Sequence, residues 1–513
     1  MPFAFTRSHQ ADMSRSEIAL FASALALVGL FTSVAGAGFP LDDSWIYQSA
    51  ARTLATNGEW ALLPGQPGAA VTSPLFTLLL AIGYKLGVNH LLWTHLLGAS
   101  ALGLQAILMA RLAVRAFPGL AAGGWIAGLL SISTWQLVWA AASGMETALF
   151  CLLTTGLIYF AWHMPTGDTR ISVFRGAAAF GILAGLTILT RPEGAVLAGL
   201  AWLAMWLGKS RRPRALAQSL LALLVCALVI APSLAINFQQ TGALLPQTAT
   251  AKLAQFSPLT RLQLSTRIAN IVLPVLAGGQ VLLLPGALVF LWRLLRKRNW
   301  RSAAPFALPC LGIAALVLIY ATFLPAGYHH GRYLIPALPS LILAGSIGLA
   351  SALTGWTRTR WRRVIAKSWL LACLSCSVIF VLFIAPSIFR RDVAIVNEEM
   401  VAAASWVAEN VPHTETLAAH DIGALSYFAR RLPIDISGLS DRDVLAVIAD
   451  ASAIWDLLAD HDVEYLIAFP IQIPDFQGRR QMLCPVYVSE GKEALRAGGV
   501  KMVVYRLAWN GDC

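Results

Sequence analysis

The sequence IALFASALALVGLFTSVAGAG, residues 18–38, decides the fold of this chain because it contains no charged residue. A helix of this length crosses a hydrocarbon core of about 30 Å. Arg7 and Arg15 precede the segment, as basic residues precede the apolar part of a signal peptide, but no clear A-x-A cleavage site follows it. We therefore expect a retained first transmembrane helix.

The composition extends this conclusion to the rest of the chain. Of the 513 residues, 57% are hydrophobic and 12% are charged, against about 25% charged in an average soluble domain. The net charge of +12 would suit a nucleic-acid-binding protein, but the basic residues lie in short clusters between apolar segments, as the positive-inside rule places them. The charge therefore indicates membrane topology, and no nucleic-acid partner is expected.

Apolar segments recur along the chain and predict about eleven membrane spans. The segments cover residues 18–38, 91–110, 125–142, 147–162, 176–190, 195–207, 220–236, 271–292, 305–324, 333–353 and 369–388. Those at 176–190 and 195–207 are shorter than the roughly 17 residues that a span usually needs. Their junction, TRPEG at residues 190–194, is therefore expected below the membrane surface, where polar groups usually line a cavity.

The loops between these segments alternate in charge, and this alternation predicts the topology. One set is short and strongly basic, and is therefore expected in the cytoplasm: Arg111 and Arg115, Arg170 and Arg175, Lys209 to Arg214, Arg293 to Arg301, and Arg358 to Lys367. The other set is mixed in charge and rich in Pro, Gly, Thr and Asn. An odd number of spans places the N-terminus inside and the C-terminal tail outside, in what we expect to be the cytoplasmic (inner) membrane of a bacterium.

The first outer loop, residues 39–90, is long and is expected to contain two helices that lie in the membrane interface. Ile46 and Ala50 share an apolar helical face, opposite Gln48, which suits a helix half buried in the interface. Residues 74–86 are apolar but too few to span the membrane. We expect them to form the second interfacial helix.

The composition changes after residue 391, which divides a membrane domain, residues 1–391, from an extracytoplasmic domain, residues 392–513. A helix-like stretch precedes three strand-like ones in the tail: residues 398–410, then 416–419, 432–436 and 464–469. The expected fold class is an all-α polytopic membrane domain, about eleven transmembrane helices with interfacial helices, followed by a small C-terminal α/β domain.

The cysteines differ in their surroundings. Cys373 and Cys376 lie in an apolar span, where packing explains them better than redox chemistry. Cys484 and Cys513 lie outside the spans, and we expect them to form a disulfide in an oxidising compartment.

Asp42 and Asp43 follow the first span directly and open the first outer helix. One carboxylate is explained by a helix N-cap, which satisfies free N–H groups and favours the positive end of the helix dipole. Capping does not explain two adjacent acids at the edge of a membrane. The pair therefore also suggests a general base, with or without a metal ion, in a cavity that faces outward.

Several cations lie on the same side of the membrane as these acids, opposite the basic cytoplasmic loops. They are Arg191, Lys252, His329, His330 and Arg332. Arg332 alone would fit an anchor at a helix end, but the group as a whole predicts an anionic ligand. Arg and Lys bind phosphate well, and a departing polyprenyl phosphate needs such stabilisation.

Short motifs, in a fixed order along the chain, carry a resemblance to a known superfamily. They are LDDSWIY (41–47), ARTLA (51–55), GEW (58–60), TSPL (72–75), SGMETA (143–148), TRPEG (190–194), PQT (246–248) with Lys252, HGRYLIP (330–336), HDIGA (420–424), and Asp435 with GLSD (438–441). Together they resemble the GT-C membrane glycosyltransferases, and most closely bacterial proteins similar to the mycobacterial terminal arabinofuranosyltransferases. The likeness to protein O-mannosyltransferases and aminoarabinose lipid A transferases is more distant.

The resemblance implies an inverting transfer of a sugar from a polyprenyl-phosphate donor to an acceptor hydroxyl outside the membrane, in a glycan, lipid or protein. It implies that Asp42 or Asp43 is the catalytic base, with Asp42 preferred because the first acid is the usual base in similar loops. The cations listed above would bind the donor phosphate. The substrate cavity would be lined by Tyr47, Glu146, Glu193 and Gln247.

The amide at position 247, the metal ion, and the identity of the two substrates each have alternatives. Where relatives have Pro-Asn-Thr, this chain has Pro246-Gln247-Thr248, so any contact made by that amide can differ. A divalent metal is a candidate cofactor, with Asp43 and His330 as candidate ligands. The motifs identify neither the sugar, a pentose or a hexose, nor the acceptor.

Two other function classes remain as alternatives. A transporter or flippase for a lipid-linked sugar would share the cations and the cavity, but such proteins are usually built from repeats, and the sequence shows no internal repeat. An envelope assembly subunit that has lost catalysis would keep the fold without the chemistry. Transfer of radiolabelled sugar from synthetic polyprenyl-phosphate donors distinguishes the enzyme from both.

The alternating loop charge generates a testable topology. In right-side-out vesicles, on a background without other reactive thiols, Lys252→Cys should react with a membrane-impermeant thiol reagent and Arg211→Cys should be protected. Labelling at position 211 but not at position 252 would overturn this topology.

Overall fold

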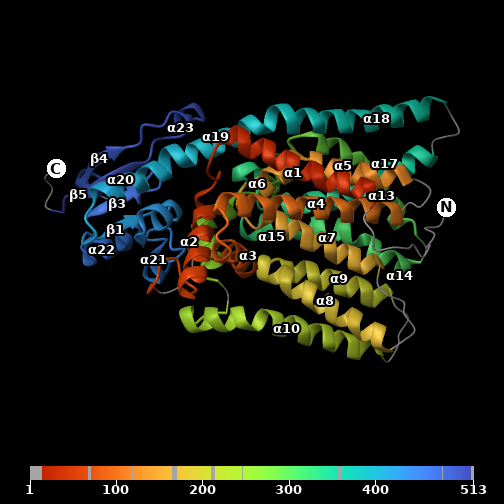
Figure 1. The fold of residues 1–513 in the computed structure, drawn as a ribbon, viewed down its shortest axis with the longest axis horizontal. Coiled ribbons are helices and arrows are strands. Elements are labelled where there is room, and N and C mark those ends of the chain that lie inside the picture. The colour runs from red at the N-terminus through yellow and green to blue at the C-terminus, as the bar shows by residue number, and fades with distance from the viewer. Residues whose placement is uncertain are drawn as a thin grey trace.

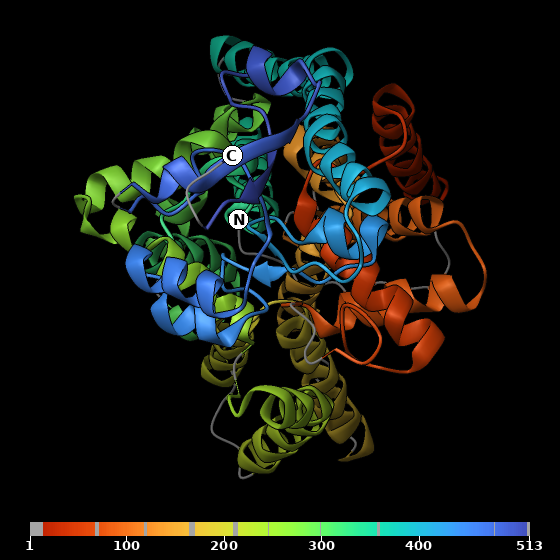
Figure 2. The ribbon, with the colours of Figure 1, turned by 90° about the vertical axis from the view of Figure 1, so that its left-hand side faces the viewer.

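The computed structural model describes residues 14–66, 71–116, 121–163, 170–208, 214–244, 246–297, 299–355, 360–476, 478–509 and 513. Long helices form a bundle, and a small α/β domain lies at one end of it (Figure 1). Figure 2 looks onto this domain, with the helices of the bundle behind it. The expected fold class is confirmed. Most of the basic loop expected at Lys209 to Arg214 lies outside the described residues.

Among the described residues, six helices are long and apolar enough to cross a membrane, as an integral membrane protein requires. They contain α1 (Arg15–Ala35), α4 (His90–Ala116), α10 (Arg214–Thr241), α15 (Leu308–Phe323), α17 (Leu338–Gly355) and α18 (Arg360–Ile379). Each coincides with one of the expected spans. The last helix continues without a break into the α/β domain through η5 (Phe380–Ile384), α19 (Ala385–Val396), η6 (Asn397–Val401) and α20 (Ala402–Asn410).

Two further expected spans are pairs of helices that meet at a bend. α5 (Ala121–Ser133) and α6 (Trp135–Ala142) meet at 58°. α12 (Leu264–Leu276) meets the helix formed by η2 (Gly279–Leu283) and α13 (Leu284–Leu295) at 105°. The single span expected at residues 271–292 is therefore two helices at nearly a right angle.

Local chemistry explains this sharp bend. Pro274 brings no backbone N–H to α12, and Gly278 has φ 142°, which suits a residue without a side chain. The side chains of Trp135 and Gln136 donate hydrogen bonds to the carbonyl oxygen of Ala277 at 2.6 and 2.8 Å. These bonds satisfy a backbone group that the bend frees inside an apolar bundle.

The remaining expected spans are shorter apolar helices, which are α7 (Thr147–His163), α8 (Arg170–Thr190) and α9 (Gly194–Gly208). α8 and α9 meet at Arg191, which is buried. The junction is therefore enclosed by protein, while its recessed position in the membrane stays a prediction.

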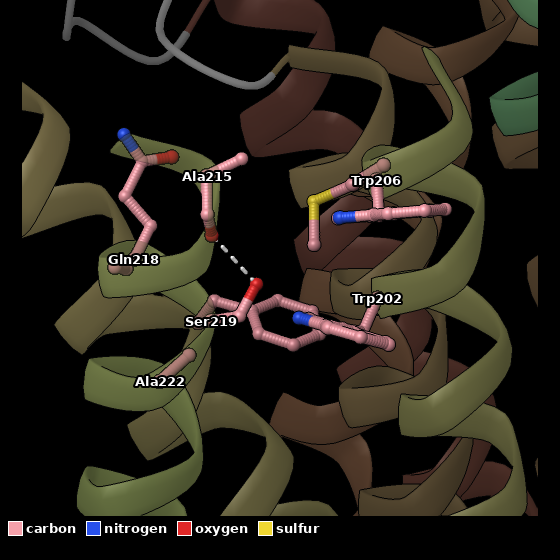
Figure 3. A pocket seen from close by; sticks show the side chains of 9 residues that line it. Trp202, Trp206, Ala215, Gln218, Ser219 and Ala222 are labelled. Carbon is pink, nitrogen blue, oxygen red and sulfur yellow. Dashed lines mark hydrogen bonds between the residues drawn. The ribbon is translucent and has the colours of Figure 1, made fainter. Parts of the chain in front are cut away.

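An apolar pocket lies between α8, α9 and α10 (Figure 3). Its lining is Ala177, Phe180, Trp202, Met205, Trp206, Ala215, Gln218, Ser219 and Ala222. None of its described lining residues is charged, and it lies where α9 ends and α10 begins, at the end of the bundle away from the α/β domain (Figure 1). The pocket is therefore separate from the polar residues that the motifs single out.

The α/β domain is built on a five-stranded sheet in the order β2-β1-β3-β5-β4. The strands are β1 (Leu417–Ala419), β2 (Ile434–Asp435), β3 (Tyr465–Ala468), β4 (Leu483–Val488) and β5 (Val503–Leu507). β1 pairs in parallel with β2 and β3, whereas β5 is antiparallel to β3 and β4. The short helical elements are η7 (Leu425–Ala429), α21 (Arg442–Val447), α22 (Ala451–Asp460), η8 (Arg479–Met482) and α23 (Glu493–Arg496).

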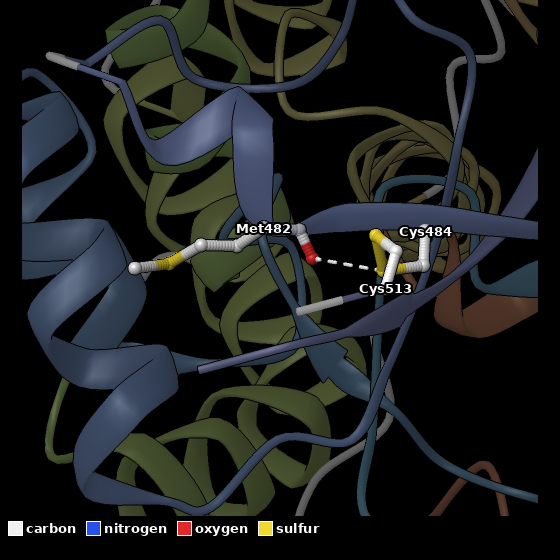
Figure 4. Close-up of a disulfide and its surroundings, with 3 residues drawn as sticks. All are labelled: Met482, Cys484 and Cys513. Atoms are coloured by element: carbon white, nitrogen blue, oxygen red, sulfur yellow. Dashed lines mark hydrogen bonds between the residues drawn. A yellow bond between two sulfur atoms is a disulfide. The ribbon is translucent and has the colours of Figure 1, made fainter. Parts of the chain in front are cut away.

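The three strands expected from the sequence correspond to β1, β2 and β3, but the expectation omits β4 and β5. β4 lies at the edge of the sheet, contains Pro485 and leaves most of its side chains at least partly exposed. Its sequence therefore lacks the alternation of a half-buried strand. The expected disulfide between Cys484 and Cys513 is present and ties Cys513 to this strand (Figure 4).

The helix of the expected first outer loop, α2 (Asp42–Asn57), is covered by protein on both faces, whereas a helix half buried in the interface is expected from the sequence. Its polar residues Gln48 and Ser49 are fully buried. Gln48 donates a hydrogen bond to Thr94 of the bundle at 2.9 Å, and Ser426 of the α/β domain donates one to Ser49 at 3.0 Å. α2 therefore lies between the bundle and the α/β domain (Figure 1), because its polar face has partners in both.

The second outer helix, α3 (Pro74–Lys85), is short and apolar, as expected. It packs against α2. Tyr84 near its end donates a hydrogen bond to Gln48 at 2.9 Å, and its hydroxyl lies 3.2 Å from that of Tyr427 in the α/β domain. The two outer helices and the α/β domain thus form one connected layer over the bundle.

The close approach of Gly423 to α2 generates a prediction. A Cβ at position 423 would lie 2.1 Å from the backbone oxygen of Asp42, so Gly423→Ala should destabilise the contact between the domains by about 1–3 kcal/mol. We expect a lower melting temperature in detergent and faster proteolysis of the α/β domain. Gly199→Ala, where nothing lies within 4 Å of the added Cβ, is the control, and equal melting of the two variants would contradict the docking contact.

Candidate active site

The two adjacent acids of α2 have different partners. The carboxylate of Asp42 accepts hydrogen bonds from the backbone N–H groups of Gly423 and Ala424, at 2.6 and 2.8 Å. These N–H groups open the helical turn that leads into η7, so Asp42 caps a helix of the α/β domain rather than its own. Asp42 is buried, and both of its carboxylate oxygens are engaged.

The surroundings of Asp42 change its acidity. Burial raises the pKa of the Asp42 carboxyl, the nearby charge of Asp421 raises it further, and the two N–H donors oppose the change, so that the pKa reaches about 8. An acid with this pKa is largely protonated at neutral pH. Asp42 therefore links the two domains and has little free capacity to accept a proton.

Asp43 lies between two cations. Its Oδ2 atom is 2.6 Å from the guanidinium of Arg332 and 3.1 Å from Nζ of Lys252. Burial raises the pKa of Asp43, but the charges of Lys252 and Arg332 outweigh it and hold the pKa well below its usual range. Asp43 is therefore ionised, and two positive charges face one negative charge.

Two separate elements bring these cations to Asp43. Lys252 lies on α11 (Gln247–Gln255), and Arg332 follows the short turn α16 (Tyr328–Gly331). Arg332 is buried and also donates to the hydroxyl of Tyr333 at 3.2 Å. Its guanidinium lies 5.0 Å from the centre of the Tyr333 ring, which adds a cation–π contact.

Arg191 belongs to a second cluster, in which two acids face it. Its guanidinium is 2.7 Å from Glu193 and 3.7 Å from Glu146, and it donates to the hydroxyl of Tyr320 at 2.8 Å. Tyr320 in turn donates to Glu193. Arg191 is one of the expected phosphate-binding cations, and the structure places two acids beside it.

Tyr47 and Tyr333 lie between the two clusters. Burial raises the pKa of Tyr47 well above its usual value, and the charges of Glu146 and Asp43 add to this, so the side chain is near both acids. Tyr333 accepts from Arg332, and the Arg191 guanidinium lies 5.9 Å from its ring. The Oε2 atom of Glu146 is buried with no hydrogen-bond partner in the described structure.

The two histidines before Gly331 have different surroundings, and the charges of Arg332 and Asp43 both act on His329. His330 is 2.7 Å from Asp392 on α19, and Trp139 donates to the same carboxylate oxygen at 2.9 Å. The His329 side chain is exposed and contacts the ring of Tyr328. No sequence motif indicates Asp392, because it simply follows two arginines in an apolar helix.

Gln247, which is expected to line the substrate cavity, joins α11 to the α/β domain. Its side-chain amide donates to the carbonyl oxygen of Gly438 at 3.2 Å. The next residue, Thr248, is buried, and its hydroxyl has no partner among the described residues. The departure from Pro-Asn-Thr therefore places a longer amide at the contact between the domains.

The donor set around Asp43 does not fit a divalent metal. Lys252 and Arg332 are both within 3.1 Å of the carboxylate, and their positive charges would repel a cation there. His330, the other candidate ligand, is paired with Asp392. Within the described ranges, no group of three or more His, Cys, Asp and Glu side chains is placed to hold a metal ion.

Sequence comparison identifies one family. The family described as "Domain of unknown function (DUF8728)" matches residues 391–503, which cover most of the α/β domain and the helix that leads into it. No curated protein sequence matches the chain.

Solved structures show similarity over nearly the full chain. The crystal structure of ArnT from Cupriavidus metallidurans bound to undecaprenyl phosphate has a TM-score of 0.60 and 14% identity, covering 98% of this chain and 100% of that one. The structure of the archaeal oligosaccharyltransferase AglB from Archaeoglobus fulgidus, in complex with an inhibitory peptide and a dolichol-phosphate, has a TM-score of 0.59 and 12% identity. The match covers 89% of this chain and 69% of that one.

The mycobacterial arabinofuranosyltransferase AftD gives a TM-score of 0.52 with 14% identity, covering 98% of this chain but 40% of AftD. This chain therefore spans less than half of AftD. At identities of 12–14% these similarities show the fold. The chain has the GT-C fold that its motifs predict.

The position of Asp42 generates a prediction about pH. Because its pKa is raised to about 8 in the folded chain, protonation of Asp42 stabilises the fold below its ordinary pKa, and this stabilisation is lost as the pH rises through about 8. The melting temperature of the wild type should fall between about pH 5 and 9. The melting temperature of Asp42→Asn should fall less over the same range. Asp43→Asn is the control and should keep the wild-type slope, whereas equal slopes for all three proteins would contradict the account of Asp42.

Proposed function

We propose that this protein is a glycosyltransferase that moves a sugar from a polyprenyl-phosphate donor to an acceptor hydroxyl on the extracytoplasmic side of the membrane. The observation that carries the proposal is the ion cluster in which Lys252 and Arg332 share the single carboxylate of Asp43. The fold supports it, because a structure with the same fold is bound to undecaprenyl phosphate.

The charge of the cluster matches the charge of such a donor. Lys252 and Arg332 exceed Asp43 by one positive charge, and a sugar phosphodiester carries one negative charge. The phosphate therefore neutralises the cluster when it binds, and it competes with Asp43 for the two cations. Arg332 offers a planar guanidinium and Lys252 a point charge, which are the two usual protein ligands of phosphate.

Donor binding would also activate the base. In the free protein the two cations hold the pKa of Asp43 low, so its carboxylate is a weak base. When the phosphate takes up these cations, the Asp43 carboxylate loses their stabilisation and binds a proton more readily. Asp43 is therefore our candidate for the base, in place of Asp42, whose two oxygens already accept backbone N–H groups.

The proposed step balances in atoms and charge. The acceptor oxygen bonds to the anomeric carbon, and the bond from that carbon to the phosphate oxygen breaks with its electron pair on the phosphate. The acceptor proton passes to Asp43. The product phosphate then gains one negative charge as Asp43 loses one, so the two cations face the same total charge before and after transfer.

Arg191 has a different place in this proposal. Glu146 and Glu193 both face it, so the cluster around Arg191 is negative overall and does not suit a phosphate. The unpaired Oε2 of Glu146 and the nearby hydroxyl of Tyr47 suit the hydroxyl groups of a sugar instead. We propose that these residues contact the sugar of the donor, and that the histidines His329 and His330 do not bind its phosphate.

The phosphate assignment generates a prediction. Lys252→Gln and Arg332→Gln should each weaken donor binding by about tenfold to a hundredfold, because each loses one charge-assisted contact. Binding is measured with a synthetic polyprenyl-phosphate sugar, and Arg360→Gln, an exposed cation at the start of α18, is the control. Folded Lys252 and Arg332 variants with wild-type affinity would place the phosphate elsewhere.

The base assignment generates a second prediction. Asp43→Asn should lower turnover by about 10²–10⁴ and leave donor affinity equal to the wild type or tighter, because the carboxylate that competes with the phosphate is gone. A screen of radiolabelled pentosyl and hexosyl donors measures turnover and identifies the sugar. Wild-type turnover in the folded variant would remove Asp43 from the mechanism.

A further inference from the structure

The topology of the α/β domain points to a second polar region beside the ion cluster. β1 lies between β2 and β3, and all three strands run parallel. Their carboxyl ends therefore meet at one edge of the sheet. In open α/β sheets, ligands bind in the crevice outside the carboxyl ends of the strands.

The residues that follow β1 and β3 place polar side chains at this edge. His420 and Asp421 come directly after β1, and Gln472 follows β3. The Gln472 amide donates to Oδ2 of Asp421 at 3.0 Å, and Nδ1 of His420 is 3.4 Å from Oδ1 of the same carboxylate. Asp435, the last residue of β2, is by contrast fully buried and accepts its hydrogen bonds from Ser437 and Ser440, so it shapes the loop that follows it.

Helix α11 contacts both this edge of the sheet and the ion cluster around Asp43. Nε2 of His420 is 3.1 Å from the side-chain nitrogen of Gln255 on α11. Lys252, which contacts Asp43, lies one turn earlier on α11, and side chains three positions apart on a helix are neighbours. His420 and Asp43 therefore contact adjacent positions of the same helix from the two domains.

Exposure distinguishes the groups that a ligand can reach from those that hold the domains together. The side chains of His420 and Asp421 are each 19% exposed, as is Lys252, and that of Asp43 is 24% exposed. Asp42 and Arg332 are buried. The reachable polar groups thus extend from the ion cluster to the sheet edge.

Other residues account for the docking of the domain. Asp42 binds two backbone N–H groups, and Arg52 donates to the carbonyl oxygen of Tyr427 at 3.1 Å. The contact of His420 with Asp421, at 3.4 Å, is longer than a normal hydrogen bond between such groups. A bracing role does not require a histidine and a partly exposed carboxylate at this edge.

We propose that His420, Asp421 and Gln472 bind the acceptor, and that the acceptor is a glycan. This inference rests on the proposed function, since it assigns the second substrate of the same site. Imidazole and amide groups both donate and accept hydrogen bonds, and a carboxylate accepts them. Adjacent sugar hydroxyls, each of which donates and accepts, match this set. The acceptor hydroxyl would then approach Asp43 from the side of the α/β domain, while the lipid donor approaches from the bundle.

The test compares two histidines at opposite ends of β1. His413, exposed and located before β1, provides the matched control His413→Gln for His420→Gln. Binding of synthetic arabinan, mannan and galactan fragments to the full-length protein in detergent is measured by saturation-transfer NMR. We expect at least one fragment to bind the wild type and His413→Gln, and His420→Gln and Asp421→Asn to weaken that binding about tenfold.

Kinetics separate this inference from the proposed function. With an active donor, His420→Gln should raise the acceptor KM about tenfold while donor affinity and slow donor hydrolysis without acceptor stay at wild-type values. A wild type that transfers no sugar to any fragment or to water would contradict the proposed function. An active wild type with an unchanged acceptor KM in His420→Gln, or a wild type that binds no fragment, would overturn the acceptor site.

Discussion

The arrangement of the polar residues between the helical bundle and the α/β domain depends on one carboxylate that two cations share. Asp43, Lys252 and Arg332 come from three elements far apart in the chain, and Asp43 contacts both cations within 3.1 Å. Charges at the edge of an apolar bundle are costly unless they are paired, so this contact holds α2, α11 and the turn before Arg332 together. The same contact leaves one positive charge unbalanced, which is why the cluster suits an anionic donor.

Asp42, the acid next to Asp43, positions the α/β domain beside the ion cluster. Successive residues of a helix point about 100° apart, so Asp42 and Asp43 face different partners from one position at the start of α2. Asp42 binds the N–H groups of Gly423 and Ala424 in the α/β domain, while Asp43 faces the bundle. This division explains why a pair of acids occurs where one cap would suffice. It also brings the carboxyl edge of the sheet, with His420, next to the ion cluster.

Much of this could be predicted from the sequence, because it depends on local patterns. Apolar segment length identified the helices of the bundle, and the ordered motifs indicated the GT-C fold, whereas the topology inferred from loop charge stays a prediction. The bend at Ala277 could not be predicted, because it depends on Trp135 and Gln136 from a distant helix. The partners of Asp42, Arg191 and His330 could not be predicted either, since which charge faces which is decided by packing between elements. The preference for Asp42 as the base followed motif order, whereas the contacts of the two acids favour Asp43.

The central claim is that a donor phosphate replaces the Asp43 carboxylate at the two cations. The most direct measurement is an experimental structure of the full-length protein with a polyprenyl phosphate bound. The account predicts phosphate oxygens within hydrogen-bond distance of Lys252 Nζ and the Arg332 guanidinium, with the Asp43 carboxylate released from at least one of them. A phosphate bound at Arg191, with both ion pairs of Asp43 intact, would contradict it.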